Sequence, residues 1–145
     1  MLGKRFLELA SMAARTAAGA TLPDGTDYPF LGQITRAAVV LDITASASDA
    51  ADVLDVYVDV SLDLGITWIN AIHFTQQAGN GAAAREYALL ALDMGNTNTV
   101  TVTSDATAGD VRPTVLGPQM RARWTIADSG DGDQSHTFRV FAYVW

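Results

Sequence analysis

Residues Leu54-Asp55-Val56-Tyr57-Val58-Asp59-Val60-Ser61-Leu62 alternate between aliphatic side chains and side chains that are mostly polar. A period of two is that of a β-strand, in which successive side chains point to opposite faces of a sheet. We therefore expect a strand with one buried face and one wet, acidic face. A turn at Asp63-Leu64-Gly65 follows, and the alternation then resumes through Trp68, Ile72 and Phe74, which predicts a hairpin.

The same period of two governs the chain from residue 36 to its end. It predicts eight strands, near residues 36–44, 54–62, 66–74, 85–92, 98–104, 111–116, 119–127 and 138–145, although residues 85–94 can also be read as a helix. Many short strands joined by polar turns are typical of a sandwich or barrel. We predict an all-β, jelly-roll-like two-sheet sandwich over residues 36–145, with an immunoglobulin-like strand order as the alternative.

The first 35 residues have a different pattern. Leu2, Phe6, Leu9 and Ala13 recur at spacings of four, three and four, which places them on one face of a helix over residues 2–18. Residues 20–35 contain two prolines and a Pro-Asp-Gly turn, so they predict a connector rather than a regular element. Residues 1–35 are therefore expected to form an N-terminal helical or extended arm outside the sandwich.

Composition excludes several kinds of function. The chain has 145 residues, the length of one domain, and no cysteine, which rules out disulfides, thiolate metal ligands and thiol nucleophiles and fits assembly in a reducing cytoplasm. Its formal net charge of −7 opposes binding to nucleic acid phosphates. No window approaches the ~18 consecutive apolar residues of a membrane span. The N-terminus begins like a secretion signal, but Glu8 and Arg15 interrupt its apolar stretch.

The ionisable residues show no catalytic arrangement, so we do not expect an enzyme or a cofactor. His73 and His136 lack the spacing of a zinc site, and there is no Gly-x-Ser-x-Gly nucleophile turn. The acidic stretch 128–133, Asp-Ser-Gly-Asp-Gly-Asp, is the best candidate for a cation such as calcium. It lacks the EF-hand spacing, and a solvated hairpin turn explains it with fewer assumptions. We therefore predict no metal site.

The last strand carries more aromatic residues than one buried face requires. Phe138, Val140, Ala142 and Val144 supply the buried face, and Phe141, Tyr143 and Trp145 lie on the opposite one. A strand with one solvent-facing side has polar residues there. Either the N-terminal segment covers these aromatic side chains, or they contact another subunit, since aromatic residues are enriched at protein interfaces.

Three segments resemble one family. Asp55–Trp68, with Phe74-Thr75-Gln76 after it, resembles the "V-x-V-x-x-S-x-D-G-G-x-T-W" hairpin of small β-sandwich virion proteins of tailed bacteriophages. Leu116–Ile126 resembles their "L-G-x-x-x-R-x-x-W-T" strand, and Thr137–Val140 resembles their closing "F-x-F-x-V" strand. One departure is Leu64, where the family pattern has glycine, so the turn type is in question.

The resemblance implies a structural protein of the virion, and within that class we favour a capsid decoration (cement) protein. It would bind the major capsid protein and copies of itself as a homo-oligomer, such as a trimer, on the capsid exterior after assembly in the bacterial cytoplasm. A tail or fibre-associated protein and a carbohydrate-binding module that uses exposed tryptophans are the alternatives. The expected interface residues are Leu2, Lys4, Arg5, Phe6, Leu9, Phe141, Tyr143 and Trp145.

Overall fold

The computed structural model describes residues 5–21, 34–94, 99–113 and 115–145, and within these ranges the chain is all-β. No helix in the described ranges is long and apolar enough to cross a membrane. The strands are β1 (Arg5–Arg15), β2 (Gly19–Thr21), β3 (Arg36–Ala45), β4 (Leu54–Ser61), β5 (Ile69–His73), β6 (Ala84–Ala91), β7 (Gln119–Ile126) and β8 (His136–Val144).

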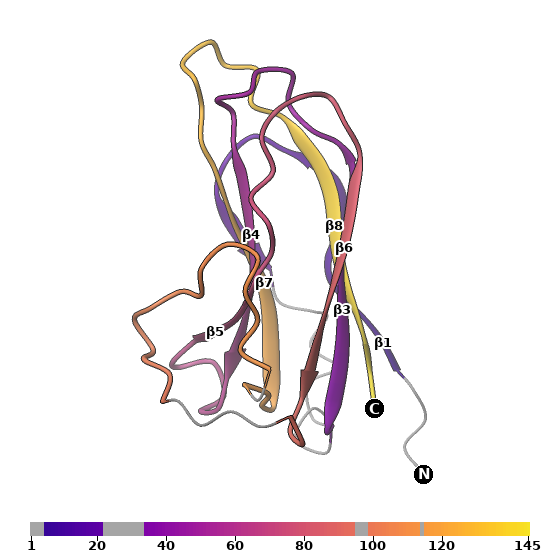
Figure 1. Ribbon diagram of the computed structural model, residues 1–145, viewed down its shortest axis with the longest axis vertical. Coiled ribbons are helices and arrows are strands. Elements are labelled where there is room, and N and C mark those ends of the chain that lie inside the picture. The colour runs from indigo at the N-terminus through magenta and orange to yellow at the C-terminus, as the bar shows by residue number, and fades with distance from the viewer. Residues whose placement is uncertain (1–4, 22–33, 95–98, 114) are drawn as a thin grey trace.

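The strands form two antiparallel sheets of four that lie face to face (Figure 1). Sheet A has the order β1-β8-β3-β6, and sheet B has the order β2-β7-β4-β5. The pairing is nested: the first strand pairs with the last, the second with the seventh, the third with the sixth and the fourth with the fifth. Strands far apart in sequence are therefore neighbours.

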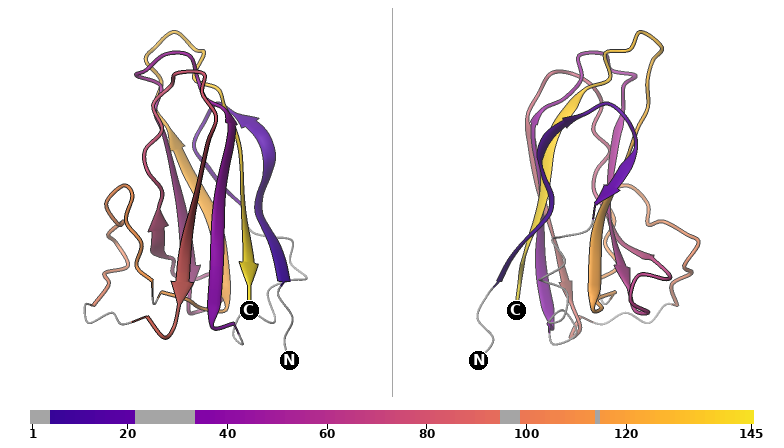
Figure 2. Two further views of the ribbon diagram at one scale, coloured as in Figure 1. Left: turned by 45° about the vertical axis from the view of Figure 1, so that its right-hand side comes forward. Right: turned by 180° about the vertical axis from the view of Figure 1, so that it is seen from behind.

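The helix expected over residues 2–18 is wrong for the described residues, which form β1 and β2 instead. β1 pairs with β8 at the edge of sheet A, and the chain then crosses to pair β2 with β7 in sheet B (Figure 2). Leu7 and Leu9 are each 1% exposed, whereas Glu8 between them faces solvent. Burial in a sheet with period two therefore overrides the helical spacing of the apolar residues. Residues 5–21 belong to the two sheets and do not form a separate arm.

The prediction for the remaining chain is confirmed for six strands and wrong for two. Residues 99–104 are not a strand, and of residues 111–116 only Val111 forms a bridge, to Ile72. Residue 98 lies outside the described residues. The helical alternative for residues 85–94 is wrong, because 84–91 is β6. Leu64, the departure from the family pattern, has φ 60°, a left-handed conformation that glycine adopts more readily.

Both sheets bury their inner faces in one core. Sheet A contributes, among others, Leu7, Val39, Leu90 and Val140 to this core. Sheet B contributes, among others, Val56, Val58, Met120 and Trp124. Trp124 meets Phe138 of the opposite sheet edge to face, with 5.6 Å between ring centroids. β2 approaches the same tryptophan so closely that a Cβ on Gly19 would lie 2.6 Å from its ring, which explains the glycine.

Candidate protein interface

The outer face of sheet A carries a continuous apolar surface. Residue pairing places Glu8, Phe141, Val40 and Tyr87 in one row across β1, β8, β3 and β6. The next row contains Phe6, Tyr143, Ala38 and Leu89 in the same strand order. We call the six apolar members other than Ala38 the aromatic face: Phe6, Val40, Tyr87, Leu89, Phe141 and Tyr143.

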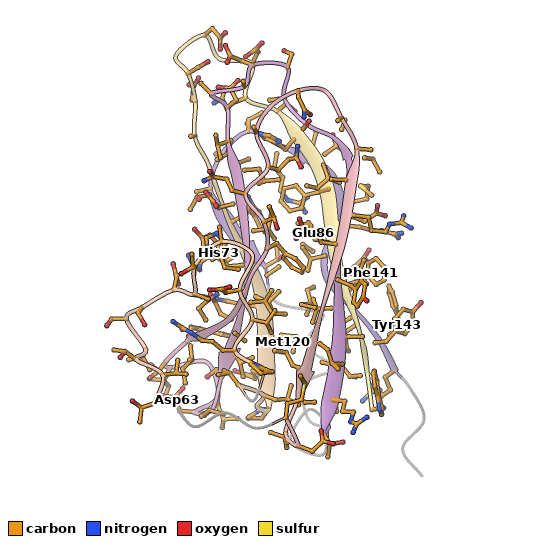
Figure 3. All side chains as sticks on the ribbon, in the orientation of Figure 1. Asp63, His73, Glu86, Met120, Phe141 and Tyr143 are labelled. Carbon is orange, nitrogen blue, oxygen red and sulfur yellow. The ribbon has the colours of Figure 1, made fainter. Side chains whose placement is uncertain are left out.

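Three rings at the β1–β8 end of this face form a cluster. The centroids of Phe6 and Phe141 are 5.5 Å apart, those of Phe6 and Tyr143 are 5.5 Å apart, and those of Phe141 and Tyr143 are 6.0 Å apart. Such distances are favourable for tilted and edge-to-face aromatic pairs. Phe6 remains 50% exposed and Tyr143 46% exposed, so the cluster offers much of its surface to solvent. Figure 3 shows Phe141 and Tyr143 on the outer side of sheet A. Tyr87, at the other side of the face, is 81% exposed.

The charges beside the aromatic face balance. Asp42 on β3 is 5% exposed and accepts hydrogen bonds from Arg85 (3.0 and 3.1 Å) and from Arg139 (3.1 Å) on the two flanking strands. The guanidinium of Arg139 also lies 4.7 Å from the centroid of Phe141. Glu8 and Asp42 are matched by Arg85 and Arg139, and Arg36 at the start of β3 pairs with Asp93. A chain with a net charge of −7 therefore presents here a neutral apolar surface.

The structure brings together three of the eight residues expected at an interface: Phe6, Phe141 and Tyr143. Arg5 is half-buried at the start of β1, and Trp145 is half-buried beyond β8, where its backbone pairs with Arg36. The prediction that Leu9 lies at an interface is wrong, because its side chain lies in the core. Leu2 and Lys4 lie outside the described residues.

Sequence reasoning missed Tyr87 and Leu89. Their strand was predicted, and the alternation of Arg85, Tyr87 and Leu89 with buried Ala88 and Leu90 was the available signal. Without the strand order, nothing connected that signal to Phe141 and Tyr143. The aromatic face exists because β3 separates β6 from β8 by one strand.

The outer face of sheet B is different, and the expectation that β4 has a wet acidic face is wrong for its centre. Asp59 is 2% exposed and accepts hydrogen bonds from Arg121 (3.0 Å), Arg123 (2.9 Å) and Asn70 (3.2 Å). Arg123 also covers the ring of Tyr57 at 4.0 Å. Burial, with the charge of Asp55, raises the pKa of Tyr57. This face is closed by its own side chains.

The two histidines hold structural contacts. The ring nitrogens of His73 lie 2.8 Å from the Ala106 carbonyl oxygen and 2.8 Å from Asp55 Oδ1, so a carboxylate orients this ring. Both nitrogens face acceptors, which leaves neither one open to a substrate proton. His136 is fully buried, and burial lowers its pKa. Its Nε2 lies 3.1 Å from the Asp52 carbonyl oxygen.

A hollow of about 400 Å³ lies where β2, the β4–β5 turn and β7 meet. Trp68, Gln119 and Arg121 line it, and Arg121 stacks on Trp68 at 4.4 Å. Trp68 is partly exposed, although its place in the apolar alternation with Ile72 and Phe74 predicts a buried side chain. The Oε1 atom of Gln119 is buried without a hydrogen-bond partner among the described residues. The hollow therefore combines a tryptophan with polar groups.

Comparisons with protein-family models, with curated proteins and with solved structures each give no match. The role of the chain is therefore argued from its own surface. Among the described residues, that surface includes the aromatic face of sheet A and the hollow beside Trp68.

Proposed function

We propose that this chain is a non-enzymatic structural protein of a tailed-bacteriophage virion, of the capsid decoration (cement) kind. The observation that carries the proposal is the aromatic face, which places six apolar side chains where a strand face in contact with water usually carries polar ones. Aromatic residues concentrate binding energy at protein interfaces. The resemblance of three segments to small virion proteins supports a virion as the assembly.

We also propose that the two sheets form a jelly-roll-like sandwich, a fold that suits this role. In a jelly roll, one long antiparallel hairpin folds over so that eight strands form two sheets. The nested pairing of β1 with β8, β2 with β7, β3 with β6 and β4 with β5 is the pairing of that arrangement. An immunoglobulin-like order has different sheet neighbours.

We assign the aromatic face to contacts between copies of the chain. Two acidic chains repel each other over most of their surface, but the balanced charges of Glu8, Asp42, Arg85 and Arg139 remove that repulsion here. The major capsid protein would be the second partner, and the basic residues Lys4 and Arg5 near the N-terminus would contact it. The assembly would then sit on the capsid exterior.

Light scattering after size-exclusion chromatography tests the contact between copies. The wild-type chain should elute as an oligomer, and Phe6→Ser with Tyr143→Ser should weaken association at least ~10-fold, which corresponds to ~1.4 kcal/mol. Ile66→Ser, which removes an even more exposed apolar side chain (86%) from the β4–β5 turn, is the control and should leave the oligomer intact. A monomeric wild type, or equal effects of both changes, would contradict the assignment.

Retention on purified phage particles tests the role itself. Wild-type chain should remain bound through washing, and the double variant should be lost at lower chain concentrations, because an oligomer binds through several weak contacts at once. Binding to tails and not to capsids would favour the tail-associated alternative.

A carbohydrate-binding module is the second candidate, because the hollow beside Trp68 holds the Gln119 amide oxygen, which has no hydrogen-bond partner in the described part of the chain. Sugars that quench or protect tryptophan fluorescence in the wild type but not in Trp68→Ala would support it. If the chain binds no sugar on a glycan array, the carbohydrate-binding alternative is excluded.

A further inference from the structure

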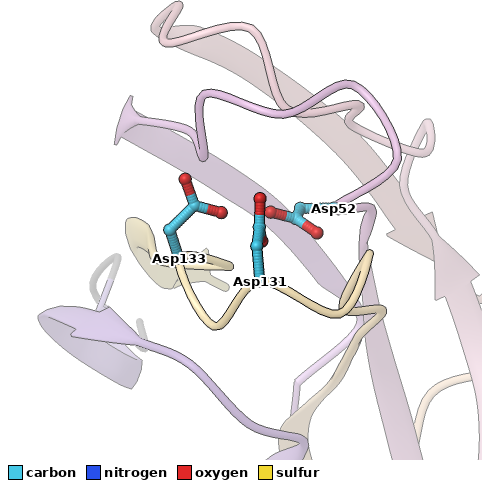
Figure 4. Close-up of side chains that lie close together, drawn as sticks. All are labelled: Asp52, Asp131 and Asp133. Atoms are coloured by element: carbon cyan, nitrogen blue, oxygen red, sulfur yellow. The ribbon is translucent and has the colours of Figure 1, made fainter.

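Three carboxylates from two loops converge at one end of the sheets. Asp52 lies in the connection between β3 and β4, and Asp131 and Asp133 lie in the connection between β7 and β8. One oxygen from each carboxylate can be chosen so that all three lie within 4.8 Å of one another (Figure 4). The sequence alone pointed to residues 128–133 and gave no sign of Asp52.

Asp52 is the unusual member of the group. It is 0% exposed, and its side chain points toward Asp131 (Figure 4). Its Oδ1 accepts a hydrogen bond from the Ser129 amide at 2.6 Å, but its Oδ2 is buried with no hydrogen-bond partner among the described residues. A buried carboxylate oxygen without a partner is costly, and native proteins compensate such a group with a hydrogen bond or a cation.

No basic side chain supplies the compensation. Among the ion pairs of the described residues, none joins an arginine to Asp52, Asp131 or Asp133. The buried His136 contacts the backbone carbonyl of Asp52, not its carboxylate. Three like charges so close together are unfavourable unless a cation lies between them or one carboxyl takes up a proton. The neighbouring carboxyls of Asp131 and Asp52 raise the pKa of Asp133, so a cation and a proton would compete for this place.

The neighbouring residues hold the carboxylates in place. The Ser129 hydroxyl lies 3.2 Å from Asp131 Oδ1, and the Ser48 hydroxyl lies 3.2 Å from Asp133 Oδ2. Asp128 Oδ1 accepts from the Gly130 amide at 2.7 Å, which fixes the turn that presents Asp131. Both loops therefore contribute to one arrangement.

We propose that Asp52, Asp131 and Asp133 bind one Ca²⁺ ion, which ties the β3–β4 loop to the β7–β8 loop. Oxygen-only donors select hard cations over zinc or copper. Ca²⁺ accepts six to eight ligands with flexible geometry, which suits three carboxylates on loops, whereas Mg²⁺ demands a near-ideal octahedron. Asp131 and Asp133 are exposed, so water can supply the remaining ligands.

Thermal unfolding of the full chain, stripped with EDTA and titrated with CaCl₂ at constant ionic strength, tests the site. We expect the midpoint to rise by several degrees and to saturate, because a ligand that binds only the folded state stabilises it. MgCl₂ at the same concentration should give a clearly smaller rise. No rise with Ca²⁺, or an equal rise with Mg²⁺, would overturn the proposal.

Variants locate the ion. Asp131→Asn and Asp133→Asn change exposed residues, so both should fold, and each should weaken Ca²⁺ binding at least ~10-fold in calorimetry, the loss expected when a charged ligand is neutralised. Asp110→Asn removes the same charge from an exposed aspartate outside the cluster and should leave Ca²⁺ binding unchanged. Equal weakening by all three variants would indicate general charge screening and would also overturn the site.

Discussion

Asp59 shows how one residue can reverse the character of a strand face. In the sequence it is one of several polar residues that alternate with valines, and such a face is normally solvated. In the fold it lies under Arg121 and Arg123, which come from the adjacent strand β7, and under Asn70 from β5. Arg121 stacks on Trp68 and Arg123 stacks on Tyr57, so the Asp59 carboxylate is shielded from water.

Replacing Asp59 by asparagine should cost about 3 kcal/mol of unfolding free energy, because it leaves two partly buried guanidinium groups without their shared carboxylate. Asp105→Asn removes an exposed partner of the same Arg123, and should cost less than about 1 kcal/mol. Urea unfolding monitored by circular dichroism measures both. Similar costs for the two variants would mean that Asp59 is not the centre of the network.

The strand β1 is the element that the sequence predicts least well. Its first residues fit both periods, since Phe6 and Leu9 agree with a helix while Leu7 and Leu9 agree with a strand. Local spacing cannot decide between them. The pairing with β8 decides, because it supplies backbone hydrogen-bond partners and an inner face for Leu7 and Leu9. That partner lies at the other end of the chain.

Alanine substitutions along β1 distinguish the two conformations. Leu7→Ala should cost about 2–5 kcal/mol, because it opens a cavity in the core. Phe6→Ala should cost less than about 1 kcal/mol in the monomer, because half of the ring is exposed. The helical face of residues 2–18 would give the reverse order, with Phe6 buried. The same urea titration separates these outcomes.

Loops explain the two strands that were predicted but are absent. Residues 104–112 satisfy their polar groups against the edge of sheet B: the Ala106 amide donates to Asn70 Oδ1 at 2.9 Å, and Arg112 Nη1 donates to the Asn70 and Ser104 carbonyl oxygens. Residues 109–112 pair with β5 through backbone hydrogen bonds to Ala71 and His73 and one bridge from Val111 to Ile72, whereas described residues 99–104 are mostly exposed. The alternating pattern of the two predicted strands therefore does not extend into a regular strand, and the sequence alone does not show this.

At the scale of the molecule, the sequence predicts the class of fold and one strip of the candidate interface. Period two predicts six of the eight strands, and the aromatic surplus on residues 138–145 indicates that the outer face of β8 is apolar. The strand order, the contribution of Tyr87 and the meeting of Asp52 with the acidic turn all depend on long-range pairing. Composition and spacing do not contain that information.

The shared core implies that the two sheets unfold together. Leu90 from sheet A and Leu54 from sheet B are both fully buried in one cluster, so Leu90→Ala and Leu54→Ala should each cost about 2–5 kcal/mol. Each change should move the urea midpoints seen by tryptophan fluorescence and by circular dichroism by the same amount, as in a two-state transition. If the probes separated in either variant, each sheet would have its own stability, and the loop connections, including the acidic cluster, would have to hold the sheets together.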